Sequence, residues 1–228
     1  MKPELASVIL EIRFSSPFDL VQIKDTRPGI FKKITGEEPP APPKQQIASG
    51  LSFNNQKQFL RVVLEPKRIA LRIENKTKEE AIETIENTFN LIYEDVNCQT
   101  LEIQRIGART IWLNQYDQSF TALLDIYKKR FYQKSLLRSE AKDVAVTLTL
   151  ENEGLKVNFI TAPISKKQLQ NQVLVFKRNL NHDYALTDID VFNEDFKNNK
   201  TEIINFLKKS ILYGEKKTKE IFNILFQQ

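Results

Sequence analysis

Residues 47–95, IASGLSFNNQKQFLRVVLEPKRIALRIENKTKEEAIETIENTFNLIYED, contain three short apolar stretches followed by an amphipathic segment. Turn-forming residues separate the apolar stretches at 54–56 and at 65–68, where a proline suits the second position of a type I turn. Thr77 and Glu80 have the spacing of a capping box, so a helix should begin after Thr77. The segment therefore predicts a three-stranded antiparallel meander closed by a helix.

A strand and a short helix should precede this meander. Alternating apolar residues predict a strand over Ser7–Arg13. A helix that begins at Asp19 and is interrupted at residues 28–29, a Pro-Gly pair, should follow it. Residues 36–43, GEEPPAPP, predict an extended surface loop.

The same order of elements recurs in the second half of the chain. Apolar patterns predict a strand at 101–113, a helix at 117–132, strands at 143–150, 155–160 and 173–180, and helices at 191–212 and 215–226. Gly107 should form a bulge or a bend in the first of these strands. Gly214 should separate the last two helices, and Asp190 or Asn193 should start the first of them.

These patterns predict an α+β fold made of two tandem strand–helix–three strand–helix units, with antiparallel sheet and an extra C-terminal helix. The units span residues 1–98 and 99–228 and should pack tightly, or form one domain around a continuous sheet. They match in element order and not in residues, so an internal duplication is a hypothesis. The pattern resembles TATA-binding-protein-like and effector-binding (GyrI/SOUL-like) folds, in which helices cover one sheet face and the other face is the working surface.

The composition is that of an ordinary globular chain, with 41% hydrophobic and 28% charged residues among 228. No apolar run is long enough to cross a membrane, and the N-terminal segment lacks the apolar core of a signal peptide. The single cysteine, Cys98, excludes an intrachain disulfide and favours a reducing cytoplasm. One cysteine and one histidine cannot form a structural zinc site.

No catalytic or cofactor motif stands out from the background. His182 lies beside Asp183 in a polar connection, which is more typical of a loop residue than of a general base. Asp188 and Asp190 have the chemistry of Mg²⁺ or Ca²⁺ ligands, but capping of the next helix or polar contacts within a hairpin are the favoured interpretations. We therefore expect no cofactor, no metal and no enzymatic activity.

The net charge of +5 lies entirely in the second half, because residues 1–100 hold 14 Lys/Arg and 14 Asp/Glu whereas residues 101–228 hold 20 and 15. One basic cluster there consists of Lys128, Lys129, Arg130, Lys134 and Arg138. Aromatic residues are interleaved with it, so it is a candidate nucleic-acid or partner-binding site in which cations bind phosphates and rings stack on bases. The alternative is a helix end, where cations favour the negative end of the dipole.

Two further pairs of charged residues each point to one face of a predicted strand. Glu11 lies two residues before Arg13, and Arg105 lies four residues before Arg109. If the two strands are neighbours, Glu11 could form a structural ion pair with Arg105 or Arg109. Such a pair would fix strand register more than it adds stability, and a ligand-binding role is the alternative.

Three segments carry a family resemblance. Residues 8–14 (VILEIRF) form an opening strand with an acid and an arginine, residues 104–111 (QRIGARTI) are similar to an R-[IL]-G-[LV]-R strand, and residues 186–192 (LTDIDVF) are similar to an LDIDV(Y/F) segment before two helices. On these segments the chain resembles a sporadically distributed bacterial and archaeal family of conserved proteins of similar length. Family members often carry a histidine where this chain has Tyr213 and Gly214, so no role for that histidine transfers.

The resemblance implies no particular activity, and its scattered distribution is the pattern of mobile-element or defence genes. We expect a basic, cytoplasmic, non-enzymatic binding module whose partner is a protein or a nucleic acid. A small-molecule effector-binding module of GyrI/SOUL-like type is the alternative. No membrane partner is expected, and self-association into a homo-oligomer stays open.

Overall fold

The computed structural model describes residues 3–17, 29–37, 51–95, 98–132, 141–152, 154–176 and 180–226. Within these ranges the longer elements are β1 (Glu4–Phe14), β2 (Leu51–Asn55), β3 (Leu60–Glu65), β4 (Arg68–Glu74), α2 (Lys78–Asp95), β5 (Ile103–Tyr116), α3 (Phe120–Phe131), β6 (Val146–Asn152), β7 (Leu155–Ile164), β8 (Asp183–Asn193) and α5 (Lys200–Phe226). A single turn, α4 (Lys166–Gln168), follows β7 and continues into a π-helical turn, Leu169–Val173. None of these helices is long and apolar enough to span a membrane.

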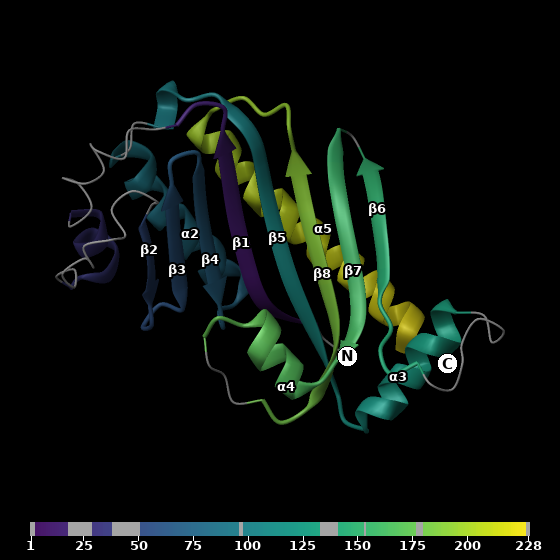
Figure 1. Cartoon of the computed structure of the whole chain (residues 1–228). Coiled ribbons are helices and arrows are strands. Elements are labelled where there is room, and N and C mark those ends of the chain that lie inside the picture. The colour runs from purple at the N-terminus through teal and green to yellow at the C-terminus, as the bar shows by residue number, and fades with distance from the viewer. Residues whose placement is uncertain are drawn as a thin grey trace.

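The eight strands form one sheet in the order β2-β3-β4-β1-β5-β8-β7-β6 (Figure 1). All paired neighbours are antiparallel. The predicted α+β class with antiparallel sheet is therefore confirmed. Strands β1 and β5, the first of each predicted unit, meet at the centre of the order, so the ladder between them joins the two units into one sheet.

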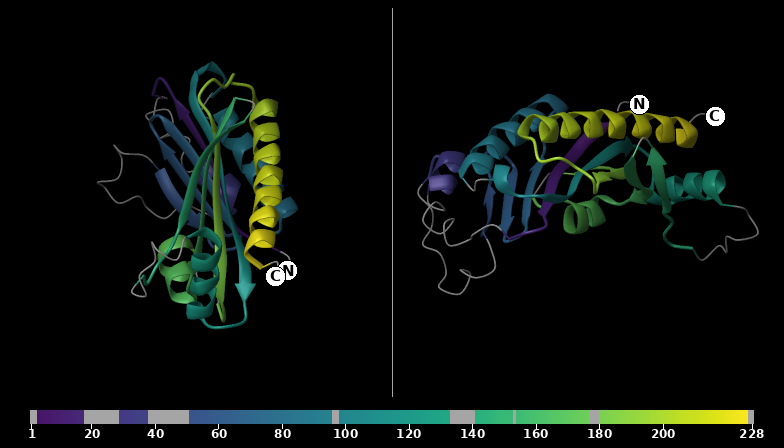
Figure 2. Two further views of the ribbon diagram at one scale, coloured as in Figure 1. Left: turned by 90° about the vertical axis from the view of Figure 1, so that its right-hand side faces the viewer. Right: turned by 90° about the horizontal axis from the view of Figure 1, so that it is seen from above.

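Helices α2 and α5 cover one face of this sheet, and α4 lies on the other (Figure 2). The alternation of β1 shows why. Val8, Leu10 and Ile12 are completely buried on the helix side, whereas the alternate residues Glu11 and Arg13 face the opposite side. The main core lies between the sheet and these two helices. The second face is left to polar side chains except where α4 and the segment after it cover it.

The helix that closes the first meander begins as predicted. The Thr77 backbone N–H donates to Glu80 Oε2 at 2.9 Å, and the Glu80 N–H donates to Thr77 Oγ1 at 3.2 Å. These two bonds satisfy donors that the first turn of any helix leaves free. The helix then buries Ala81, Ile85 and Phe89, spaced four residues apart, against the sheet.

The predicted bulge at Gly107 is wrong. Gly107 pairs in continuous register with Glu11 on β1 and with Phe192 on β8. The register between β1 and β5 shifts instead near the strand ends, between Arg13 and Phe14 and between Leu5 and Ser7. A glycine inside a strand pattern often marks a bulge, but this one stands where long side chains crowd one face.

The predicted third strand of the second unit is also wrong. The described residues of this range, 173–176 and 180, are not in a strand, and the strand beside β7 is β8, Asp183–Asn193. The apolar run at 173–176 instead lies across the second sheet face as part of a strap, Ser165–Phe176. Leu169 and Leu174 of this strap pack on Ile111 and Leu113 of β5.

The two predicted C-terminal helices are one helix, α5, which runs through Gly214 without a break. Gly214 faces the sheet, where an ideal Cβ would lie 2.5 Å from Thr110 Oγ1. Glycine is therefore a close-approach residue here, not a helix terminus. Nor does Asp190 or Asn193 start this helix: the Asn199 side chain caps it by accepting the Glu202 N–H at 3.2 Å.

The remaining predicted boundaries moved by a few residues or fall outside the described ranges. Ser119, not Asp117, caps α3, because its side chain accepts the Ala122 N–H at 3.3 Å. Residues 29–35 are helical. The Asp19 start of that helix and most of the proline-rich loop at 36–43 lie outside the described residues.

Candidate functional site: an arginine row on the open sheet face

The three segments that carry the family resemblance lie side by side at the centre of the sheet. They form most of β1, the middle of β5 and most of β8, which are consecutive in the strand order. Glu11, Arg13, Arg105 and Arg109 all point to the face that α2 and α5 leave uncovered. The structure therefore brings together the four residues that the sequence predicts as an ion-pair group.

Arg13 is the centre of a row of three arginines. It lies directly opposite Arg68 on β4 and directly opposite Arg105 on β5. Neighbouring strands are about 4.8 Å apart, so the three side chains leave the sheet within roughly 10 Å. Like charges directly opposite one another destabilise a sheet, so this arrangement, the arginine row, needs an explanation.

Glu11 touches every member of the arginine row. Its Oε1 lies 2.7 Å from Arg13 Nη2 and 3.4 Å from Arg105 Nη1, and its Oε2 lies 2.7 Å from Arg68 Nη2. The Glu11 side chain is 15% exposed, whereas that of Arg13 is 50% exposed. One carboxylate thus serves three guanidinium groups, and its neighbour Arg13 has much of its surface in solvent.

The outer members of the row have further partners. Arg68 Nη1 lies 3.3 Å from a Glu65 carboxylate oxygen. Arg105 Nη2 lies 2.9 Å from Asp190 Oδ2, and its guanidinium carbon sits 4.4 Å from the centre of the Phe192 ring. The Phe192 ring and the Asp190 carboxylate together fix the orientation of the Arg105 guanidinium plane. Arg13, by contrast, is oriented by its ion pair with Glu11.

Arg109 stands further along β5 and is fully engaged. Its Nε donates to Asp188 Oδ1 at 2.7 Å and its Nη2 donates to Asp188 Oδ2, which makes a bidentate pair. Asp188 and Asp190 therefore are strand residues that pair with arginines, and the prediction that they cap the next helix is wrong. In the described part of the chain no group of three His, Cys, Asp or Glu could hold a metal ion.

The titration of these groups depends on their surroundings. Burial alone would raise the pKa of Glu11, but hydrogen bonds and charge from Arg68 and Arg13 lower it below the ordinary value. Burial raises the pKa of Asp190 despite the opposing charge of Arg105. The hydrogen bond to Asp188 raises the pKa of Arg109. The lowered pKa of Glu11 and the raised pKa of Arg109 both favour the charged forms of these two groups, which suits them to binding charge.

A shallow cavity of about 400 Å³ opens over these residues. Ile9 and Gly107 form part of its lining, and the arginine row and Arg109 form much of the rest. A Cβ on Gly107 would lie 3.4 Å from Asp190 Oδ1 and 3.5 Å from Arg105 Nη1. A larger side chain at this position would enter the space between the charged groups, so glycine keeps the cavity open.

The other half of the same face is closed by the strap Ser165–Phe176. Glu74 on β4 is completely buried beneath it and accepts the backbone N–H groups of Val175 and Phe176 at 3.0 Å each. Arg72 pairs with Glu74 at 2.6 Å and also donates to the Val173 carbonyl. The strap thus covers this face over the end of β4 and over Ile111 and Leu113 of β5, and leaves the arginine row uncovered.

The predicted basic cluster is placed elsewhere. Lys128, Lys129 and Arg130 form the last turn of α3, while Lys134 and Arg138 lie outside the described residues. Helix α3 packs with the C-terminal part of α5, and its Tyr127 is buried on Thr161, to which it hydrogen bonds at 2.8 Å. These cations stand at a helix C-terminus, where the dipole favours them, and they do not join the arginine row.

The lone histidine and cysteine do not form a catalytic group. His182 Nδ1 lies 3.5 Å from Asp117 Oδ1 near the start of β8, with both side chains well exposed. Cys98 is buried, and burial raises the pKa of its thiol to about 12. A thiol with so high a pKa is not a nucleophile at neutral pH.

Arg68 is the site residue that sequence reasoning missed. The sequence places it in the turn before β4, where an arginine is unremarkable. Only the register between β1 and β4, which sets Arg13 opposite Arg68, gives it a part in the row. The alternation of acids and apolar residues in LTDIDVF is a usable signal for strand β8, since period-two alternation is typical of a half-buried strand.

Comparisons with known proteins add little. No protein-family model matches the chain, and no curated protein matches it. Among solved structures, Methanococcus jannaschii TBP aligns over 95% of this chain and 99% of its own, with 11% sequence identity and a TM-score of 0.30. A likeness this weak is no basis for transferring a function or a binding surface.

Proposed function

We propose that this protein is a non-enzymatic binding module that holds a nucleic acid against the open part of its sheet. The arginine row carries the proposal, because three guanidinium groups on adjacent strands share the single carboxylate of Glu11. The planar guanidinium fork matches phosphate oxygens in pairs. Arg68 and Arg105 also pair with Glu65 and Asp190, whereas the only ion pair of Arg13 within the described residues is with Glu11. The Arg13 side chain is 50% exposed, so a phosphate laid over the row would reach it from solvent.

A protein partner fits this face less well. Protein interfaces have an apolar centre surrounded by polar groups, whereas the cavity over the arginine row is lined mainly by charged side chains. The large apolar residues that the described part of the chain exposes are Leu148 and Leu150 on β6 and Leu212 and Ile224 on α5. None of them lines this cavity.

The competing explanation is structural. A network of Glu11 with three arginines could serve only to fix the register of β4, β1 and β5, since half-buried ion pairs specify geometry more than they add stability. The two explanations differ in the expected effect of removing Glu11. In a structural network its loss only destabilises the fold, whereas in a binding site its loss frees the arginines for an external anion.

The test is fluorescence-polarisation binding of short single- and double-stranded DNA and RNA at about 50 and 200 mM salt. We expect binding that weakens steeply with salt. The Arg13→Ala/Arg68→Ala variant should lose at least about tenfold in affinity and reduce the salt slope by about 2, since each phosphate contact contributes about 1.

Two further variants separate the explanations. Glu11→Gln has nearly the same shape and should bind several-fold more tightly than the natural protein, because the arginines lose their internal counterion. Lys128→Ala/Lys129→Ala removes the same number of cations from α3 and should leave affinity unchanged. No binding at low salt, or a loss confined to the α3 variant, would refute the arginine row as a nucleic-acid site.

The cellular location and the assembly of such a module are inferred from the sequence and not from the arginine row. A cytoplasmic location and a part in a mobile-element or defence assembly are suggested by the single cysteine and by the family resemblance, and they belong to the proposal. An acidic protein would be the second partner to test if every nucleic acid fails to bind.

A further inference from the structure

A second cavity lies on the helix side of the sheet and shares no lining residue with the cavity over the arginine row. Its volume is about 770 Å³, within the range of small-molecule sites. The start of β1, the turn before β3, the connection from β4 to α2, and single residues of β5 and α5 line it. We call it the junction pocket, because Trp112 and Glu215 come from the second predicted unit and the rest from the first.

The backbone of the junction pocket is strained at two points. Phe59 has φ +52° and Asn75 has φ +55°, and in the described part of the chain no other residue except glycine has a positive φ. For a bulky aromatic such as phenylalanine this conformation is costly. Phe59 is held in it by its carbonyl, which accepts the Glu74 N–H at 3.1 Å, and by its ring, which packs edge-on against Phe176 at 5.8 Å.

Two buried polar atoms of lining residues lack partners. Asn75 Oδ1 and Trp112 Nε1 are buried, and neither has a hydrogen-bond partner within the described residues. The indole N–H lies against α5, because Nε1 is 3.2 Å from the position of an ideal Cβ on Gly214. An unpaired buried polar group costs about 1–3 kcal/mol, and strained residues gather at ligand sites more often than elsewhere. The strain at Phe59 and the unpaired amide oxygen of Asn75 therefore point to a binding site.

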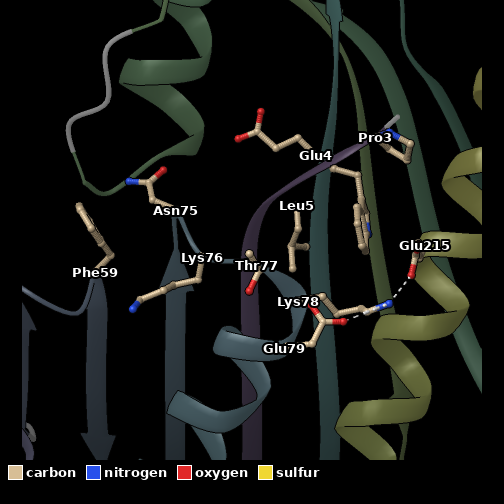
Figure 3. A pocket seen from close by; sticks show the side chains of 11 residues that line it. Pro3, Glu4, Leu5, Phe59, Asn75, Lys76, Thr77, Lys78, Glu79 and Glu215 are labelled. Atoms are coloured by element: carbon tan, nitrogen blue, oxygen red, sulfur yellow. Dashed lines mark hydrogen bonds and ion pairs between the residues drawn. The ribbon is translucent and has the colours of Figure 1, made fainter. Parts of the chain in front are cut away.

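Five charged side chains line the pocket: Glu4, Lys76, Lys78, Glu79 and Glu215. Figure 3 shows Lys76 on the side of Phe59 and Asn75, and Glu79 on the opposite side, with Leu5 and Thr77 between them. Lys78 has two partners, Glu215 at 2.8 Å and Glu79 at 3.7 Å (Figure 3). Lys76 forms no salt bridge within the described part of the chain.

We propose that the junction pocket binds a small zwitterion with an apolar body, such as an apolar amino acid or a short peptide. Lys76 at one end complements a carboxylate, and Glu79 at the other, whose side chain is 77% exposed, complements an ammonium group. Phe59, Leu5 and the indole ring supply the apolar walls. Rotation of the Asn75 side chain would turn its unpaired amide oxygen toward a donor on the ligand.

Binding in the pocket can be followed by intrinsic fluorescence, because Trp112 lines it and is the only tryptophan in the chain. Its fluorescence is titrated with L-phenylalanine, and in parallel with phenethylamine and 3-phenylpropionate, which each retain the ring and one of the two charges. We expect a saturable change with phenylalanine and at least about tenfold weaker binding of both analogues, since a site with paired polar groups rejects ligands that lack one. Equal binding of either analogue would overturn the zwitterion assignment.

The Asn75→Gly variant tests whether the fluorescence change arises from binding in the junction pocket. Asn75→Gly keeps a residue that accepts positive φ and removes the amide, so it should fold and lose at least about fivefold in phenylalanine affinity. Lys129→Ala on α3 is the control and should bind as the natural protein does. No fluorescence response to any of the three compounds up to about 10 mM, or an Asn75→Gly variant that binds normally, would overturn the site.

Discussion

Glu11 and Glu74 are carboxylates on the same face of one sheet, and their surroundings differ completely. Glu74 is 0% exposed, pairs with Arg72, and accepts two backbone N–H groups of the strap. Glu11 is 15% exposed, accepts no backbone donor within the described residues, and is shared among three arginines. Glu74 accepts from fixed backbone donors, whereas the partners of Glu11 are partly exposed arginine side chains, two of which also pair with Glu65 and Asp190.

The difference separates a structural charge from a binding charge. An external anion cannot take the place of Glu74, because its donors are backbone groups of the strap. The strap would have to dissociate from the sheet before a ligand could reach them. A half-buried acid among partly exposed arginines competes with any anion that arrives from solvent. Substitutions of the two acids should therefore differ in both stability and binding.

The largest effect should come from Glu74. Glu74→Ala leaves Arg72 unpaired beneath the strap and two backbone N–H groups without an acceptor, so the free energy of unfolding should fall by about 3–5 kcal/mol. Urea denaturation measures it. Glu74→Gln retains an acceptor oxygen and should lose less. Glu65→Gln is the control, because its side chain is 43% exposed and its loss should change stability by under about 0.5 kcal/mol.

Glu11→Gln should destabilise the fold far less than the Glu74 variants. Its arginine partners Arg13 and Arg68 are 50% and 36% exposed, so water compensates much of the lost interaction, and the cost should be about 1 kcal/mol. The same urea measurement serves. If Glu11→Gln lowers the free energy of unfolding as much as Glu74→Ala does, the two acids do not differ in role, and a purely structural network around Glu11 is favoured.

The pH dependence of stability should also distinguish the Glu11 variant. Because the arginines lower the pKa of Glu11 in the folded protein, its contribution is present above its ordinary value of 4.5 and is lost as the pH falls through the lowered folded value. The stability gap between the natural protein and Glu11→Gln should be constant from about pH 7 to 5.5 and shrink below about pH 4.5. Urea unfolding at a series of pH values gives the gap, and a gap that widens in acid would contradict the assigned shift.

The smallest effect is expected at α3. Lys128→Ala/Lys129→Ala removes two cations that the helix C-terminus accommodates in solvent, so the free energy of unfolding should change by no more than about 0.5 kcal/mol. Thermal or urea unfolding detects it. A larger loss would mean that this end of α3 has contacts beyond the described residues.

Local patterns predicted what is local in this protein. The capping box at Thr77 and Glu80, the alternation of β1 and the meander of β2, β3 and β4 are visible in the sequence because each depends on neighbours a few residues apart. The glycines mislead for the same reason. Local context suggests a break at Gly214, whereas the atom that requires glycine there is Thr110 Oγ1, about a hundred residues away in sequence. At Gly107 the nearest atom to an ideal Cβ would be Asp190 Oδ1, at an ordinary contact distance of 3.4 Å.

The candidate site is half predicted by the sequence. Glu11, Arg13, Arg105 and Arg109 stand out, since each pair shares a strand face. Nothing local points to Arg68, and local context favours a helix cap or hairpin contacts for Asp188 and Asp190 over their arginine partners. Strand order and register decide these partners, and neither is encoded by any local pattern.

The sequence by itself determined the class of the fold, the alternation that gives each strand a buried and an exposed face, and the sign of the charges on that exposed face. The tertiary structure alone decided that three arginines from β4, β1 and β5 stand in one row, that the strap covers part of the face, and that the junction pocket is lined by residues of both predicted units. The physical reason is distance along the chain. Side-chain periodicity acts over a few residues, whereas the contact of Arg13 with Arg68 and Arg105 exists only once the sheet has assembled.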